Sequence, residues 1–238
     1  DNICTRLINP EARYHYCSEI LRKSFYDGSR WNMDECDSHT IFVSQGYYPI
    51  KGLHYMLEAL GDIRKFYPDA RLRVAGGVSL NNAGLKNRLK QKNYQRYLAE
   101  LIEKYSLAGC VEFLPPLKAD EMKKMYLKSN VFVSPSSIEN SPNSLGEAMM
   151  LGVPCVSSLV GGVGNMLING AEGFTYQHDA PYMLAYYVME IFRLQKENRQ
   201  QLADMTDMAH SHAMRLFDSE KNAANMLEIY SGIERIKR

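Results

Sequence analysis

The stretch at 134–154 combines residue types that suit a phosphate-bearing ligand. An apolar run at 131–134 gives way to a loop rich in Ser, Asn and Pro, after which a helix is expected over about 142–151. Ser141 can cap this helix, and Pro142 suits its first position. Because the amino terminus of a helix offers free N–H groups and partial positive charge, the stretch predicts a pyrophosphate site at the end of a strand.

Two glutamates in this stretch are separated by seven residues. Glu147 falls about five residues into the expected helix, where a carboxylate can accept hydrogen bonds from a ribose diol. Glu139 lies in the loop ahead of the helix. Eight residues of helix would separate the carboxylates by roughly 12 Å, too far for a glycosidase pair, although a loop that folds back would bring them closer. We interpret the two as contacts along one extended ligand, with Glu139 at its sugar end and Glu147 at its ribose.

A lysine and four glycines could serve the same ligand. Lys51 opens an expected helix, where its charge opposes the helix dipole. This misfit favours a phosphate contact over a purely solvated role. Gly76 and Gly77, like Gly161 and Gly162, permit either tight turns or a close approach of backbone to ligand.

From Thr40 onward, short apolar segments alternate with longer segments of helical pattern. The expected strands are 40–44, 71–75, 111–114, 131–134, 154–157 and 172–175, and the expected helices are 51–66, 86–105, 118–128, 142–151 and 163–169. Strands that are apolar throughout indicate a sheet covered on both faces. Their alternation with helices predicts right-handed βαβ units, and therefore an α/β fold with a doubly wound, Rossmann-like parallel sheet.

Extra helices are expected at both ends of the chain. Asn9 can cap a helix over 10–28 that Gly28 would end. Its apolar stripe would consist of Ala12, Tyr16, Ile20 and Phe25. Residues 29–39 are polar and are interpreted as a linker. From about Pro181 the pattern predicts two or three helices, the last over about 218–236.

Composition and charge exclude several classes of protein. The formal net charge of +1 gives no reason to expect nucleic acid or an acidic membrane surface as a partner. No apolar run approaches the roughly 20 residues that span a bilayer. The five cysteines lack a Cys-x-x-Cys spacing, which favours a reducing compartment and a cytoplasmic location. His210 and His212 would point about 200° apart on a helix and are not expected to form a metal pair.

Glu139 and Glu147 resemble the E-x7-E motif of glycosyltransferase family 4. Other segments resemble this family in the same order along the chain. They are Pro49–Gly52 with Leu57–Leu60, Val74–Gly77, Val111–Leu117, Val160–Gly162 and Asn169–Gly173. The resemblance extends over about residues 40–232.

This resemblance implies the carboxyl-terminal half of a retaining glycosyltransferase of the GT-B type, with a nucleoside-diphosphate sugar as donor and no required metal or cofactor. It implies a catalytic role for Glu139. The donor-binding residues that it implies are Lys51, Gly46, Gly76, Asn140, Ser141, Asn143, Ser144, Leu145, Glu147 and Leu117. The acceptor would be a saccharide or a lipid-linked intermediate, and a full-length enzyme could associate peripherally with the inner face of a membrane.

The expected division of the chain has three parts. Residues 1–39 would be the remainder of an amino-terminal acceptor domain, 40–215 the nucleotide-sugar-binding domain, and 216–238 a helix that crosses to the missing domain. On this interpretation the chain alone binds the donor but transfers no sugar, because nothing positions an acceptor hydroxyl.

Two positions depart from the family pattern. Gly46 stands where an arginine is usual, which removes one phosphate-neutralising charge, and Asn165 stands where a glutamate is usual. Two alternatives therefore stay open. The chain could be a non-catalytic nucleotide-sugar-binding module or part of a GT-B sugar-nucleotide epimerase.

Overall fold

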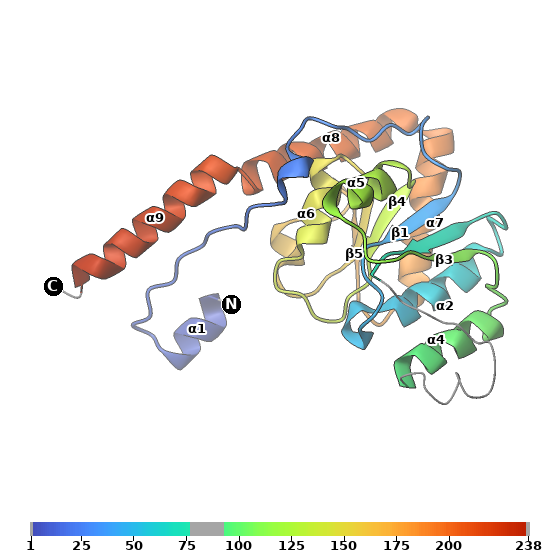
Figure 1. Cartoon of the computed structure of the whole chain (residues 1–238), viewed down its shortest axis with the longest axis horizontal. Coiled ribbons are helices and arrows are strands. Elements are labelled where there is room, and N and C mark those ends of the chain that lie inside the picture. Colours follow the sequence, from blue (N-terminus) through green and yellow to red (C-terminus); the bar gives the residue numbers. More distant parts are fainter. Residues whose placement is uncertain (1, 77–92, 237–238) are drawn as a thin grey trace.

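Six parallel strands form one sheet in the order β3-β2-β1-β4-β5-β6 within the residues that the computed structural model describes, 2–76 and 93–236 (Figure 1). The strands are β1 (Thr40–Val43), β2 (Arg71–Val74), β3 (Val111–Phe113), β4 (Val131–Ser134), β5 (Cys155–Ser158) and β6 (Phe174–Tyr176). From β1 the chain proceeds to one edge through β2 and β3, and from β4 it proceeds to the other edge. The sheet is therefore doubly wound, and all six predicted strands are confirmed.

Helices cover both faces of this sheet (Figure 1). They are α2 (Leu53–Ile63), α4 (Asn93–Lys104), α5 (Ala119–Leu127), α6 (Asn143–Met150), α7 (Pro181–Glu197) and α8 (Arg199–Leu216). The helices α2 and α7 pack together on one face, and α6 packs on the other, where α8 covers it. This two-sided cover explains why every residue of β1, β4 and β5 is buried.

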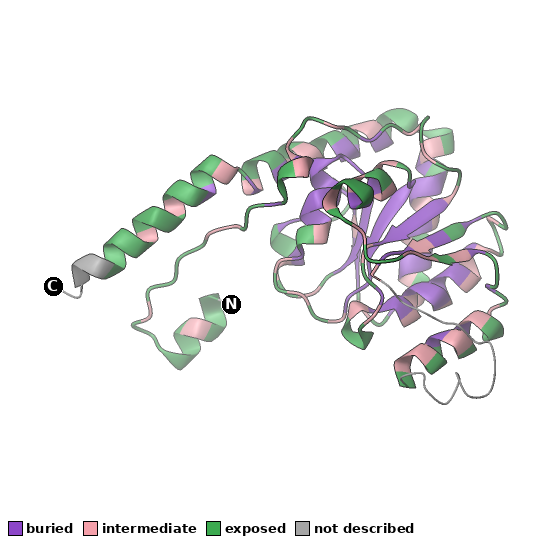
Figure 2. Ribbon diagram, in the orientation of Figure 1, coloured by how far each residue is buried: buried purple, intermediate pink, exposed green. Residues whose placement is uncertain are grey.

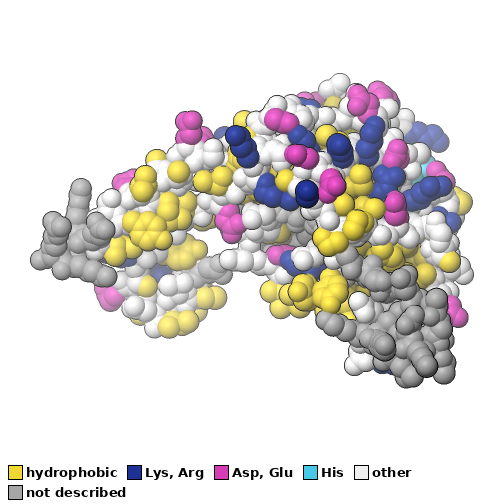
Figure 3. All heavy atoms as spheres, in the orientation of Figure 1, with side chains coloured by type: hydrophobic (Ala, Val, Ile, Leu, Met, Phe, Trp, Pro, Cys, Tyr) yellow, Lys and Arg dark blue, Asp and Glu magenta, His cyan; other side chains and the backbone are white. Residues whose placement is uncertain are grey.

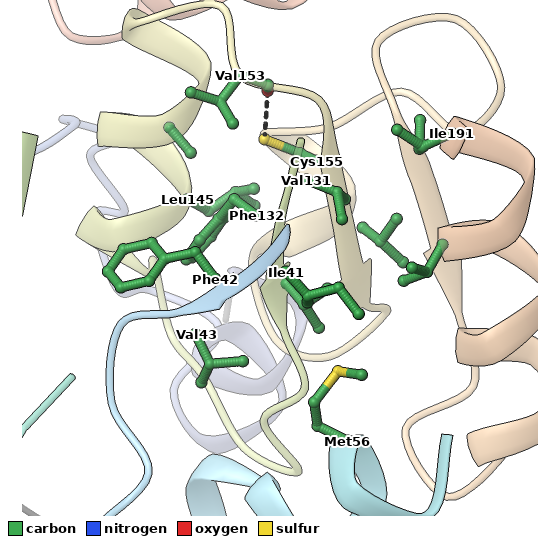
Figure 4. Close-up of a cluster of buried hydrophobic side chains, with 14 of the residues drawn as sticks. Ile41, Phe42, Val43, Met56, Val131, Phe132, Leu145, Val153, Cys155 and Ile191 are labelled. Carbon is green, nitrogen blue, oxygen red and sulfur yellow. Dashed lines mark hydrogen bonds between the residues drawn. The ribbon is translucent and has the colours of Figure 1, made fainter. Parts of the chain in front are cut away.

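Successive side chains of the central strands enter opposite halves of the core. Figure 4 shows Phe42 of β1 on the side of Leu145 from α6, whereas Ile41 points toward the side of α2 and α7. The α2 and α7 side contributes Met56 and Ile191. All five side chains are buried, as expected for strands whose alternate residues face different layers.

The predicted helices that follow β1 agree with the structure except near β6. Those expected over 51–66, 118–128 and 142–151 are α2, α5 and α6, and that over 86–105 is α4, with 86–92 outside the described residues. The helix expected over 163–169 is wrong, because only the 3-10 turn η3 (Val163–Asn165) forms. Beyond it, the Ile168 N–H donates to the Glu172 carboxylate at 2.9 Å and the Gly170 N–H to the Gly173 carbonyl at 2.8 Å. These bonds close a turn that leads into β6.

The helix expected over 10–28 is also wrong. A short helix α1 (Asn2–Ile8) ends before it, and only the 3-10 turn η1 (Lys23–Phe25) lies inside it. The Asn9 side chain accepts the Glu11 N–H at 3.1 Å and so forms a turn instead of a cap. Tertiary packing outweighs helix propensity here, because Phe25 is buried against Tyr126 of α5.

The linker over 29–39 lies against the domain. The Trp31 indole N–H donates to the Ser129 carbonyl at 2.8 Å. Asp34 pairs with Arg199 at 2.7 Å and Asp37 with Arg73 at 2.7 Å. These contacts fix the polar segment to the sheet and its helices.

The last helix, α9 (Ser219–Ile236), extends beyond the sheet and its covering helices (Figure 1). It matches the helix predicted over 218–236, and the Asp218 side chain accepts the Lys221 N–H at 3.0 Å at its start. Residues of the segment 12–22 run beside it, and the Cys17 thiol donates to the Asn222 carbonyl at 3.4 Å. Figure 2 shows α9 as largely exposed, and Figure 3 shows hydrophobic side chains over its surface.

Candidate functional site

A cavity of about 490 Å³ lies at the carboxyl ends of the central strands. Residues that follow β1 and β2 line one side, and the loop and first turns of α6, which follow β4, line another. The order of the sheet reverses between β1 and β4. In doubly wound sheets this switch point is where ligands bind, and the volume lies in the range of small-molecule sites.

Lys51 and Glu139 form an ion pair of 2.6 Å inside this cavity. Lys51 ends the 3-10 turn η2 (Pro49–Lys51) after β1, and Glu139 lies in the β4–α6 loop. The Ser136 hydroxyl also donates to Glu139, at 2.7 Å. Both charged side chains are largely buried, with 24% and 13% exposed, so their charges are only partly screened by water.

Close packing of two loops creates this pair. Gly52 has a φ of +71°, and a Cβ there would lie 1.7 Å from the Pro135 carbonyl oxygen. The Ser137 N–H donates to the Ile50 carbonyl at 2.8 Å. A glycine is therefore needed where the β1–α2 loop crosses the β4–α6 loop. Lys51 was expected to open the following helix, but Gly52 separates it from α2.

Glu147 is the fifth residue of α6 and is held by Arg22. The Arg22 Nε donates to Oε1 at 2.6 Å and Nη2 to Oε2 at 2.7 Å, which makes the pair bidentate. The Tyr126 hydroxyl lies 3.4 Å from Oε2. The hydrogen bond to Glu147 raises the pKa of Arg22, and burial raises the pKa of Tyr126 well above its usual range, so Tyr126 stays a neutral donor. Only 5% of the Glu147 side chain is exposed, and a carboxylate so buried needs such partners.

The amino terminus of α6 also borders the cavity. The prediction that Ser141 caps this helix is wrong, because the helix begins at Asn143 and no side chain caps it. The Ser141 hydroxyl points instead to the Met166 sulfur at 3.7 Å, and Pro142 occupies the cap position. The first N–H groups of an α-helix have no partner within the helix, so this end can accept an anion.

The structure brings most of the predicted site residues to one cavity. Those that line it are Lys51, Gly76, Leu117, Glu139, Ser141, Asn143, Ser144 and Glu147. Leu145 belongs to the core and is fully buried. Asn140 lies outside the lining, and its carbonyl accepts the Gly162 N–H at 2.8 Å.

Gly46 also lies outside the lining, and neighbouring side chains pack closely around it. A Cβ at this position would lie 2.6 Å from Leu53 Cδ2 and 2.7 Å from Val74 Cγ1. No larger side chain fits there without movement of these two residues. Its neighbour Gln45 lines the cavity instead.

Two of the other predicted glycines, Gly161 and Gly162, serve loop packing. Gly161 has a φ of +53°, and a Cβ there would lie 1.6 Å from the Glu139 carbonyl oxygen. Gly161 and Gly162 therefore press against the backbone that carries Glu139, a close approach between two loops. Gly77 lies outside the described residues.

The main site residue missed in the sequence is Arg22. It lies in a segment interpreted as an ordinary helix, and no local spacing links it to Glu147, 125 positions away. Tyr126 was missed for the same reason. Ser136, by contrast, stands in the quoted loop three residues before Glu139, and a hydroxyl at that distance could have been considered.

No group of three or more His, Cys, Asp or Glu side chains that could hold a metal ion occurs in residues 2–76 and 93–236. Across the same described ranges, no helix combines the length and apolarity that a membrane crossing requires.

Comparison with known sequences gives consistent matches. The sequence model of the family described as "Glycosyl transferases group 1" matches residues 31–206. The chain is 28% identical over 186 residues to D-inositol 3-phosphate glycosyltransferase of Corynebacterium urealyticum, which covers 77% of this chain and 41% of that protein. It is 29% identical over 194 residues to the protein of the same name from Paenarthrobacter aurescens, with 82% and 44% covered. The chain thus spans less than half the length of these relatives.

Solved structures share the fold at lower sequence identity. Sucrose-phosphate synthase of Thermosynechococcus elongatus superposes with a TM-score of 0.78 at 18% identity, over 99% of this chain and 56% of that one. HepE of Anabaena, solved in complex with UDP-glucose, superposes with a TM-score of 0.67 at 20% identity, over 82% and 49%. These matches confirm the Rossmann-like fold of a GT-B glycosyltransferase domain.

Proposed function

The chain belongs to the family of group 1 glycosyl transferases, and we propose that its cavity binds the nucleoside-diphosphate sugar donor of a retaining, family 4-type enzyme. The observation that carries this proposal is the meeting of Lys51, Glu139 and Glu147 with the start of α6 in one cavity at the switch point of the sheet. A cation and a helix amino terminus suit the diphosphate, and a buried carboxylate suits the ribose diol.

Each residue has a distinct role in this proposal. Lys51 and the first N–H groups of α6 neutralise the diphosphate, whose charge increases as the bond to the sugar breaks. Glu147 accepts hydrogen bonds from the ribose. Glu139 contacts hydroxyls of the transferred sugar and steadies positive charge at its anomeric carbon. No metal ion is required for these contacts. HepE in complex with UDP-glucose and the pneumococcal O-GlcNAc transferase GtfA in complex with UDP and GlcNAc support a nucleotide-sugar donor.

Transfer itself needs an acceptor, which we propose to be a saccharide or a lipid-linked intermediate. The chain spans less than half of its curated relatives, and its described residues contain one six-stranded sheet. A GT-B enzyme places its acceptor against a second domain. We therefore propose that the 238 residues bind the donor without transferring its sugar.

The packing around Gly46 favours a second candidate, a non-catalytic module that binds nucleotide sugars. Leu53 and Val74 leave no room at this position for the arginine that family 4 enzymes usually carry there. The two candidates share the donor site and differ in turnover. Sugar transfer by a protein that joins this chain to its acceptor domain supports the enzyme, and donor binding without transfer in that protein supports the module.

A thermal-shift panel tests the donor site. UDP, GDP, ADP and their glucose conjugates are added to the chain, with and without EDTA. The matching ligand at about 100 times its dissociation constant is expected to raise the free energy of unfolding by roughly 2.7 kcal/mol, and EDTA is expected to leave this shift in place. If none of the three diphosphates or their conjugates stabilises the chain, the proposed function is wrong.

A further inference from the structure

Four charged side chains of the cavity form two ion pairs. Lys51 pairs with Glu139 at 2.6 Å, and Arg22 pairs with Glu147 at 2.6 Å. A diphosphate adds further negative charge to this balanced set. Its binding is favoured most when one of the cations exchanges its carboxylate partner for the ligand.

Arg22 has a fixed backbone and a partly exposed side chain. Its neighbour Leu21 is buried, and the Leu21 N–H donates to the Tyr26 hydroxyl at 3.0 Å. That hydroxyl donates in turn to the Phe217 carbonyl at 2.8 Å. These contacts fasten the backbone beside Arg22 to the end of α8, while 42% of the Arg22 side chain remains exposed.

Glu147 lies at the other end of this pair and is nearly inaccessible. Both of its carboxylate oxygens accept hydrogen bonds from Arg22. A ribose that uses this carboxylate must therefore compete with the guanidinium for its oxygens. A second donor is nearby, because the Tyr126 hydroxyl lies 3.1 Å from the Ser144 carbonyl and 3.4 Å from Oε2, so its proton can turn to the carboxylate when the guanidinium leaves.

We propose that Arg22 is a further donor-binding residue. In the absence of nucleotide its guanidinium binds Glu147, and when the ribose binds the Glu147 carboxylate, the guanidinium turns to bind the diphosphate. This inference rests on the proposed function of the cavity. A guanidinium fits two phosphate oxygens as it fits two carboxylate oxygens. Glu147 is the fifth residue of α6 and lies roughly 6 Å along the helix from its amino terminus. The guanidinium would have to move over about this distance to reach a diphosphate at the start of α6.

The exchange predicts different effects of an Arg22 substitution on diphosphate affinity and on nucleoside affinity. Loss of a purely structural contact would change both affinities alike. Loss of Arg22 removes a partner of the diphosphate and also removes a competitor of the ribose. Diphosphate binding therefore weakens while nucleoside binding does not. The ratio of the two affinities isolates this effect, because changes in the general shape of the cavity act on both ligands alike.

Titration calorimetry on the whole chain measures the affinities of uridine and UDP, guanosine and GDP, and adenosine and ADP. The pair whose diphosphate binds most tightly to the wild type is then used for all variants. In Arg22→Gln the ratio of diphosphate to nucleoside affinity is expected to fall roughly tenfold to a hundredfold, with no loss of nucleoside affinity. Arg30→Gln is the matched control. Arg30 lies in the same amino-terminal segment and pairs with the exposed Asp207 outside the cavity lining, so its ratio is expected to equal that of the wild type.

An unchanged ratio in Arg22→Gln, or an equal loss for nucleoside and diphosphate, overturns the inference. If Arg22→Gln does not fold, Arg22→Lys serves instead. Lysine keeps the charge without the planar fork, so its ratio is expected to fall by less, and a wild-type ratio overturns the inference. Failure of the wild type to bind any diphosphate would refute the donor site itself and is a distinct result.

Discussion

At the scale of single residues, Lys51 and Glu139 show how two side chains far apart in the sequence come to lie side by side in one cavity. They come from different loops and meet at 2.6 Å in the wall of the cavity. The Ser136 hydroxyl gives Glu139 a second partner at 2.7 Å. In the proposed donor complex, the carboxylate would therefore keep a hydrogen bond when Lys51 turns to a phosphate.

Replacement of Lys51 by alanine is expected to affect the diphosphate far more than the nucleoside. The lost charge-assisted contact is worth roughly 1.5–3 kcal/mol, or about tenfold to a hundredfold in affinity for the diphosphate. Calorimetric titration of Lys51→Ala with both ligands measures this difference. Lys65→Ala is the control, because Lys65 pairs with Asp62 at the surface. Equal losses for nucleoside and diphosphate in Lys51→Ala would assign this lysine a structural role.

At the scale of helices and strands, the loops after β1 and β4 determine where these side chains lie. The β1–α2 loop reaches the β4–α6 loop only because Gly52 carries no side chain at its closest point to Pro135. The 3-10 turn η2 and the start of α2 meet at this glycine. The position of Lys51 thus depends on a backbone contact.

Gly52→Ala is expected to destabilise the chain by about 2–5 kcal/mol, from overpacking against the Pro135 carbonyl and from strain at positive φ. Urea unfolding of the variant and the wild type measures this loss. Gly232→Ala on α9 is the matched control, since a Cβ there meets no atom within 4 Å, and alanine in a helix is expected to be neutral or slightly stabilising. Similar stability of Gly52→Ala and the wild type would show that the two loops can separate without cost.

The sheet and the order of its helices could be predicted because apolar strands and amphipathic helices alternate from Thr40 onward. Glu139, Glu147 and Lys51 could be predicted because strand ends and helix starts converge in such folds. Arg22 could not, since its position depends on burial of Leu21 and Phe25 in contacts distant in sequence. The helix expected over 10–28 failed for the same reason, because an apolar stripe does not reveal which neighbours will bury it.

At the scale of the whole molecule, the proposed donor site and the terminal segments are physically connected. Arg22 reaches into the cavity from the segment 12–22, which also runs beside α9 (Figure 1). The exposed apolar residues of α9 include Leu227 and Tyr230, and we expect this helix to contact an acceptor domain. Nucleotide binding that moves Arg22 would then act on the segment that runs beside α9.

A crystal structure of the chain with its best-binding nucleoside diphosphate tests whether the cavity is the donor site. One nucleotide is expected in the cavity between the ends of β1 and β4. Its ribose hydroxyls should lie within hydrogen-bond distance of Glu147, and its diphosphate beside Lys51 and the start of α6. A nucleotide bound elsewhere, for example in the groove between residues 13–16 and α9, or one whose ribose lies away from Glu147, would contradict the account.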